Sequence, residues 1–195
     1  MSRKGFTLIE VMIVLAILGA VLLVGMPRIF KTNTNIKSVA RHFIVLSKDI
    51  RNKARLTNST YRLVIDLDSQ DGQYWVERAN GPQPVDPEAY EKAKEKESEK
   101  KEDAPPPLFQ IDKSITKKEQ TLPGGLRFGS VETANMKAPL TSGIAYVHFF
   151  PEGFVEAAAV QITNGNNLTW TLVFNPLTGQ ADIIEKASSL KDVQR

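Results

Sequence analysis

The chain has 195 residues, which is enough for one globular domain with an appendage. Its net charge of +3 at pH 7 is small, so composition does not demand a basic surface for nucleic acid or anionic lipid. The lack of cysteine excludes disulfide bonds and cysteine-ligated zinc. Hydrophobic residues make up 42% of the chain but are spread unevenly, and residues 1–26 are very apolar.

The chain begins with a long apolar segment that contains a single carboxylate, Glu10. From Phe6 to Met26 it has 21 residues, or about 31 Å of helix, which matches the ~30 Å hydrocarbon core of a bilayer. A cleaved secretory signal normally has a shorter apolar region, of about 7–15 residues, and a small-residue cleavage site after it. We therefore predict a membrane-spanning helix over residues 6–27. Basic residues flank this helix on both sides, so they do not orient it.

A one-sided apolar pattern follows Pro27 and predicts an amphipathic helix over residues 28–59. We expect one long helix with a bend at Pro27, because proline removes a helical hydrogen bond. Asn58 and Ser59 are the predicted stop. The apolar side chains recur at steps of three and four residues and should form the buried face: Ile36, Val39, Ala40, Phe43, Leu46, Ile50 and Ala54.

Residues 60–185 are typical of a β-rich domain. Short runs of β-branched and aromatic residues alternate with turn residues, and the turns at 69–72, 151–153 and 175–179 favour an antiparallel meander. The meander needs a cover for its apolar face, which the amphipathic helix can supply. We therefore predict an α+β fold, a long N-terminal helix packed on antiparallel β-sheet. The predicted strands cover residues 61–68, 73–78, 143–150, 154–162, 168–175 and 179–185.

Two segments fall outside this pattern. Residues 82–107 form a charged insertion, with seven acidic and five basic residues between Glu88 and Asp103, which predicts a solvated loop without fixed structure. A partner-binding loop is the alternative. Residues 186–195 are the predicted C-terminal tail, where Lys186, Lys191 and Arg195 give only weak support for DNA binding.

The sequence shows no arrangement typical of catalysis, so we predict no catalytic residue, no cofactor and no enzyme activity. His42 and His148 are expected to be surface or boundary side chains. The run from Asp66 to Gly72 loosely echoes a calcium loop, but its glycine is one place late and its flanks are strands. We interpret it as a plain hairpin turn and predict no metal site.

The run Gly5-Phe6-Thr7-Leu8-Ile9-Glu10, after a short basic leader, resembles the class III signal of type IV pilins and pseudopilins. The resemblance implies that a prepilin peptidase removes residues 1–5 by cutting between Gly5 and Phe6, and that Phe6 is then N-methylated. It also implies a single-pass protein of the cell inner membrane with its C-terminal domain in the periplasm. Glu10 can then pair with the Phe6 amine of a neighbouring subunit and set the register between subunits. Pro27 falls where many pilins carry a helix-kinking proline.

Phe149-Phe150-Pro151-Glu152-Gly153, with Gly179 in the last turn, is similar to the C-terminal pattern of the GspH/FimT family, in which Phe149, Pro151 and Gly153 fill an F-x-P-x-G motif. This resemblance implies a pilin-like fold and the role of a minor pseudopilin of type II secretion. Such a subunit lies near the tip of the periplasmic pseudopilus and supports export of folded proteins through the outer-membrane secretin. The alternative is a minor type IV pilin that acts in pilus assembly or DNA uptake.

The same resemblance implies the partners. They are other minor pseudopilins, the major pseudopilin, the prepilin peptidase, the inner-membrane assembly platform and membrane lipid. No small-molecule substrate is expected, and nucleic acid is the less favoured partner.

Overall fold

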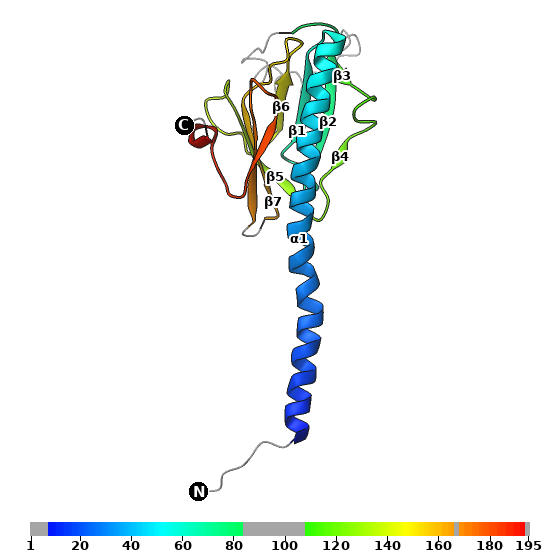
Figure 1. Cartoon of the computed structure of the whole chain (residues 1–195), viewed down its shortest axis with the longest axis vertical. Coiled ribbons are helices and arrows are strands. Elements are labelled where there is room, and N and C mark those ends of the chain that lie inside the picture. The colour runs from blue at the N-terminus through cyan, green and yellow to red at the C-terminus, as the bar shows by residue number, and fades with distance from the viewer. Residues whose placement is uncertain (1–7, 84–107, 166–167, 194–195) are drawn as a thin grey trace.

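The computed structural model describes residues 8–83, 108–165 and 168–193. Helix α1 (Leu8–Thr57) is its longest element, with 50 residues, which corresponds to about 75 Å. The first part of α1 extends away from the rest of the chain, and its last turns lie along a β-rich domain (Figure 1). None of the helices in the described residues combines the length and the hydropathy of a membrane span.

Helix α1 keeps its α-helical structure through Pro27. A change of direction at this residue stays a prediction. The helix ends at Thr57, and Asn58 then has a positive φ of 47° while the Ser59 N–H donates to the Ala54 carbonyl at 3.1 Å. Asparagine in this left-handed conformation is a common way to end a helix, so the stop predicted at Asn58 and Ser59 is confirmed.

The buried face of α1 is the face predicted from its apolar spacing. All the predicted side chains are at most 6% exposed, whereas Lys37, Arg41 and Lys48 between them face solvent. Each buried aliphatic or aromatic side chain contributes about 1.5–3 kcal/mol, so this face attaches the helix firmly to the domain. The buried residues are Ile36, Val39, Ala40, Phe43, Leu46, Ile50 and Ala54.

The first sheet has five strands, in the order β3-β2-β1-β6, with β4 paired to β2 outside this path. All its pairings are antiparallel. Strand β6 pairs with β1 along its whole length, so that Tyr61 lies opposite Phe149 and Asp66 opposite Ile144. The strands are β1 (Tyr61–Asp66), β2 (Gln73–Ala79), β3 (Phe109–Ile111), β4 (Gln120–Thr121) and β6 (Ile144–Phe149).

The second sheet has four antiparallel strands in the order β5-β7-β8-β9. It is followed by the short helix α3 (Leu190–Val193), which packs on this sheet through Leu190. The described part of the predicted C-terminal tail is therefore attached to the domain. The strands are β5 (Arg127–Thr133), β7 (Ala158–Thr163), β8 (Thr169–Phe174) and β9 (Ala181–Ile184).

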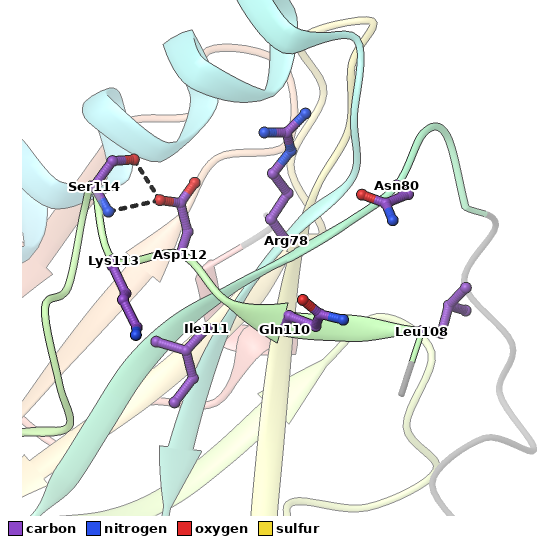
Figure 2. Close-up of a pocket in the computed structure, with 8 residues that line it drawn as sticks. All are labelled: Arg78, Asn80, Leu108, Gln110, Ile111, Asp112, Lys113 and Ser114. Atoms are coloured by element: carbon purple, nitrogen blue, oxygen red, sulfur yellow. Dashed lines mark hydrogen bonds between the residues drawn. The ribbon is translucent and has the colours of Figure 1, made fainter. Parts of the chain in front are cut away.

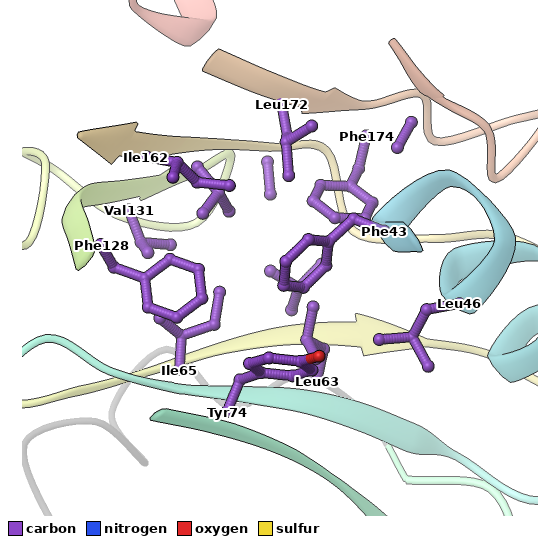
Figure 3. Close-up of a cluster of buried hydrophobic side chains, with 14 of the residues drawn as sticks. Phe43, Leu46, Leu63, Ile65, Tyr74, Phe128, Val131, Ile162, Leu172 and Phe174 are labelled. Carbon is purple, nitrogen blue, oxygen red and sulfur yellow. The ribbon is translucent and has the colours of Figure 1, made fainter. Parts of the chain in front are cut away.

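The hydrophobic core lies where the two sheets and α1 meet (Figure 3). The Phe43 ring of α1 is 4.9 Å from the Tyr74 ring of the first sheet and 6.0 Å from the Phe128 ring of the second. Aromatic pairs at these separations add about 0.5–1.5 kcal/mol beyond their buried area. Phe43 thus joins all three layers, and the predicted α+β fold is confirmed.

The expectation of a simple meander is wrong. Strand β6 pairs with β1, and the chain then passes through the turn at Pro151 into the second sheet, so β6 and β7 are not neighbours. The predicted strand over 154–162 starts too early, because β7 begins at Ala158. Strand β5 was missed because Gly129 and a bulge between Phe128 and Ser130 break its alternating pattern.

Candidate functional site

The residues of the N-terminal motif divide into two groups. Gly5 and Phe6, the predicted cleavage and methylation sites, lie outside the described residues. Glu10 lies in the first turn of α1 and is exposed, where a carboxylate also interacts favourably with the positive end of the helix dipole. The cleavage, the methylation and the pairing of Glu10 stay predictions.

Large apolar side chains surround Glu10, and each of them is exposed, from 48% at Val11 to 82% at Leu8. A helix that is apolar on all sides is normally covered by lipid or by other protein. Within the described residues, the first turns of α1 thus present an apolar surface suited to an external apolar environment. The side chains are Leu8, Ile9, Val11, Met12, Ile13, Val14, Leu15, Ile17 and Leu18.

Both glycine turns of the predicted C-terminal motif lie against α1. Gly153 and Gly179 have φ values of 94° and 64°, which glycine adopts without steric cost. Arg51 Nε donates to the Gly153 carbonyl at 2.7 Å, and Arg51 Nη2 donates to the Leu177 carbonyl at 3.3 Å. Ser47 Oγ donates to the Gly179 carbonyl at 2.6 Å. We term Ser47, Arg51 and these two turns the helix latch.

Space as well as backbone conformation requires glycine in the helix latch. A Cβ atom on Gly179 would collide with Arg51 Cδ, and one on Gly153 would approach Arg55 Cδ to 3.0 Å. The sequence pattern identified the two glycines but missed Ser47 and Arg51. Their hydrogen bonds join residues that are 102 to 132 positions apart, so no local spacing could reveal them.

The remaining motif residues support the turns. The Phe149 ring is fully buried and meets the Phe174 ring edge-on, with centroids 6.3 Å apart. The turns also bond to each other, because the Val155 N–H donates to the Pro176 carbonyl at 2.9 Å. Pro151 is half-buried at the surface. The F-x-P-x-G residues and the glycine of the last turn therefore form one structural unit that receives the helix.

A buried acid–base pair lies next to this unit, between His148 of β6 and Glu156 in the segment that leads from β6 to β7. Glu156 Oε2 is 2.7 Å from His148 Nδ1 of β6, and Asn135 Nδ2 donates to Glu156 Oε1 at 3.0 Å. Burial alone would raise the pKa of Glu156, but the hydrogen bond and charge of His148, together with the Asn135 hydrogen bond, hold this pKa below its usual value. His148 is 8% exposed, so the expectation of a surface or boundary side chain is wrong, whereas His42 is exposed as expected.

The loop that loosely echoes a calcium site is a hairpin turn. Asp66 Oδ1 accepts the backbone N–H groups of Asp68 and Ser69 at 2.9 and 3.2 Å, so this carboxylate closes the turn itself. No group of three metal-ligating side chains occurs in the part of the chain that the structure describes.

Comparison with known proteins places the N-terminal segment in a recognised class. The prokaryotic N-terminal methylation motif matches residues 1–26. No curated protein matches the chain. Among solved structures, the minor pseudopilin EpsH from the Type 2 Secretion System of Vibrio cholerae is similar, with 14% identity and a TM-score of 0.43 over 76% of this chain and 95% of that chain. The chain thus carries the prokaryotic N-terminal methylation motif, followed by a long helix that packs on antiparallel β-sheets.

Proposed function

We propose that the chain is a GspH-like minor pseudopilin of type II secretion, a structural subunit near the tip of the periplasmic pseudopilus. The observation that carries this proposal is the methylation motif over residues 1–26. The exposed apolar first turns of α1 support it, because a filament subunit needs a helix that can leave lipid and pack against other subunits.

We propose roles for three residues of the motif. We propose that prepilin peptidase cleaves between Gly5 and Phe6 and methylates the new amine. Glu10 then pairs with the Phe6 amine of a neighbouring subunit. Removing one partner of a buried ion pair costs about 3–5 kcal/mol. Any axial register that leaves Glu10 unpaired is therefore higher in free energy by a similar amount. Before assembly, the helix anchors the subunit in the inner membrane with its β-rich domain in the periplasm.

The helix latch supports the same role. In a subunit anchored by α1, any force between the filament and the domain passes through the packing of this helix on the sheets. Arg51 and Ser47 attach the helix to the turns that precede β7 and β9. The Gly153 and Gly179 turns thus lie where α1 is attached to the domain, as expected if α1 is the anchor.

The function is tested in the strain that carries the gene, by complementing a deletion with single variants and measuring secreted protein in the medium. Glu10→Ala should abolish secretion and co-purification with the major pseudopilin. Asp49→Ala is the matched control, because Asp49 is an exposed acid on the same helix beside the domain, and it should complement fully. Full complementation by Glu10→Ala would contradict the proposed role of Glu10.

Processing is tested separately. Gly5→Leu should leave a full-length chain, whereas the wild-type protein should have the mass of residues 6–195 plus one methyl group. A wild-type mass that includes Met1 would contradict cleavage. If the deletion strain secretes normally but loses pili or DNA uptake, the chain is a minor type IV pilin instead.

A further inference from the structure

Three large apolar side chains are exposed around the helix latch. Leu56 is 84% exposed, Phe154 51% and Leu177 68%. Leu56 lies in the last turn of α1. Phe154 follows Gly153, whose carbonyl accepts Arg51 Nε, and the Leu177 carbonyl accepts Arg51 Nη2. The three side chains therefore surround one junction, and we term them the latch patch. Exposed apolar side chains that gather in one place commonly mark a protein interface.

An open pocket of about 620 Å³ lies beside Leu56, between the last turns of α1 and the turn at Pro151. Its apolar lining is Leu56 and Pro151, and its polar lining is Asn52, Arg55 and Glu152. The lining thus combines apolar side chains with one cation and one anion. A pocket of this size can receive a large apolar side chain from another molecule next to the latch patch.

The two charged side chains of this pocket, Arg55 and Glu152, have opposite signs. Both are exposed, and neither makes a side-chain hydrogen bond or an ion pair with residues 8–83, 108–165 and 168–193. Their charges cancel, so the pocket does not favour a polyanion such as nucleic acid. It instead fits a surface that carries an acid opposite Arg55 and a base opposite Glu152.

A second pocket, beside β3 of the first sheet, provides a contrast (Figure 2). Its acid is already engaged, because Asp112 Oδ1 accepts the backbone N–H of Ser114 at 2.7 Å and also the Ser114 hydroxyl (Figure 2). Its Arg78 likewise donates from Nη2 to Ser59 Oγ at 3.3 Å. These charged groups have partners within the chain, whereas the charged groups beside the latch patch are available to another molecule.

The position of the latch patch along α1 argues against lipid as its cover. The predicted membrane span ends at Pro27. At 1.5 Å per residue, about 40 Å of helix separates Pro27 from Leu56, so a bilayer around the predicted span does not reach the patch. A folded protein surface is therefore the cover that fits.

We propose that a second copy of this chain covers the latch patch in a two-fold symmetric dimer. Arg55 of each copy pairs with Glu152 of the other, and the apolar side chains of the two patches pack between these ion pairs. A two-fold contact requires a self-complementary surface, and apolar side chains beside one available cation and one available anion meet this requirement. Exposed ion pairs contribute little affinity, so the apolar side chains hold the dimer and the charges fix its orientation. The dimer goes beyond the proposed function and does not depend on it.

The test is sedimentation equilibrium of the full chain in density-matched neutral detergent. We expect a monomer–dimer equilibrium for the wild type. Arg55→Glu and Glu152→Arg should each weaken the dimer by about tenfold or more, because each places two pairs of like charges opposite each other. An equimolar mixture of these two variants should regain wild-type affinity. One copy then brings two acids and the other two bases, so both ion pairs form again.

Further variants locate the contact. Leu177→Ser should weaken the dimer by about tenfold, because it removes an apolar side chain of the latch patch. Val45→Ser is the matched control and should dimerise like the wild type, since Val45 is 58% exposed on α1 but lies outside the pocket and the patch. Glu10→Ala should also dimerise like the wild type, which separates this contact from the proposed pairing of Glu10. Circular dichroism checks that each variant is folded.

Three results would overturn the proposal. The first is a wild type that stays monomeric at about 100 μM, which would leave the patch to a different protein. The second is an unchanged dissociation constant in folded Arg55→Glu, Glu152→Arg and Leu177→Ser, which would place the association on another surface. The third is a mixture of the two charge variants that dimerises no better than either variant alone.

Discussion

Replacing Gly179 with alanine should destabilise the domain mainly through Arg51. The new Cβ would collide with Arg51 Cδ, and the φ of 64° would strain any residue other than glycine. This strain costs about 1–2 kcal/mol. Displacing Arg51 also weakens its bonds to Gly153 and Leu177, and hydrogen bonds of charged groups are worth about 1.5–3 kcal/mol. We expect the free energy of unfolding to fall by about 3–4 kcal/mol in total.

The chain offers a matched control for the strain alone. Gly125 has a φ of 72°, and a Cβ there would meet nothing within 4 Å. Gly125→Ala should therefore cost only about 1–2 kcal/mol. In an Arg51→Ala background the collision with Arg51 disappears and only the close approach to Val155 Cγ2 at 3.1 Å remains, so Gly179→Ala should then cost little more than this control. The two positions should show a coupling energy of about 2 kcal/mol.

Urea unfolding of the full chain in detergent measures these differences. The fluorescence of the two tryptophans follows the unfolding of both sheets. Trp75 lies in β2 of the first sheet, and Trp170, which is 6% exposed, lies in β8 of the second. The slope of the free energy of unfolding against urea concentration must be the same for wild type and variants before their stabilities are compared. If Gly179→Ala costs as much without Arg51 as with it, the reasoning about the helix latch is refuted.

Three further predictions concern the rest of the domain. Glu156→Gln should cost about 3 kcal/mol at pH 7. Because the pKa of Glu156 is lower in the folded than in the unfolded chain, its stabilisation is complete above the unfolded pKa and is lost as pH falls through the folded pKa. Urea midpoints of wild type and variant should therefore converge in acid, and a constant gap would contradict this. Leu190→Ala should cost about 2 kcal/mol, whereas the exposed Leu56→Ala should change stability by less than about 0.5 kcal/mol; equal costs in urea would show that α3 does not pack. Deleting Glu88–Asp103 should shift the melting temperature by less than about 2 °C in calorimetry, and a larger fall would mean that this segment packs.

The parts of the fold that depend on local patterns could be predicted. The buried face of α1 follows from a repeat of three to four residues, and strands β1 and β2 follow from β-branched runs around a turn. Strand β5 could not be found in this way, because its bulge at Gly129 interrupts the alternation. The division into two sheets could not be predicted either. A short turn normally joins neighbouring strands of one sheet, whereas the turn at Pro151 joins β6 of the first sheet to β7 of the second.

For a related reason, only some residues of the candidate site could be predicted from the sequence. Gly153 and Gly179 stand out because a left-handed turn selects glycine locally. Arg51 looks like any other cation on the helix, and its role depends on two carbonyls that are distant in sequence. Glu156 and His148 differ, because they are only eight positions apart and pair across the turn at Pro151, but their burial depends on the packing of the whole domain.

The pairing of β6 with β1 also determines when the domain can fold during synthesis. One edge of β1 stays open until Ile144–Phe149 has left the ribosome, because its partner there is encoded so late. Contacts between such distant segments form slowly, since the intervening chain must first be ordered. The entropy of closing that chain grows only with the logarithm of its length, by about 0.6 kcal/mol for each doubling. The charged segment 82–107 lies within this interval, so lengthening the chain there postpones closure of the first sheet but barely changes its final stability.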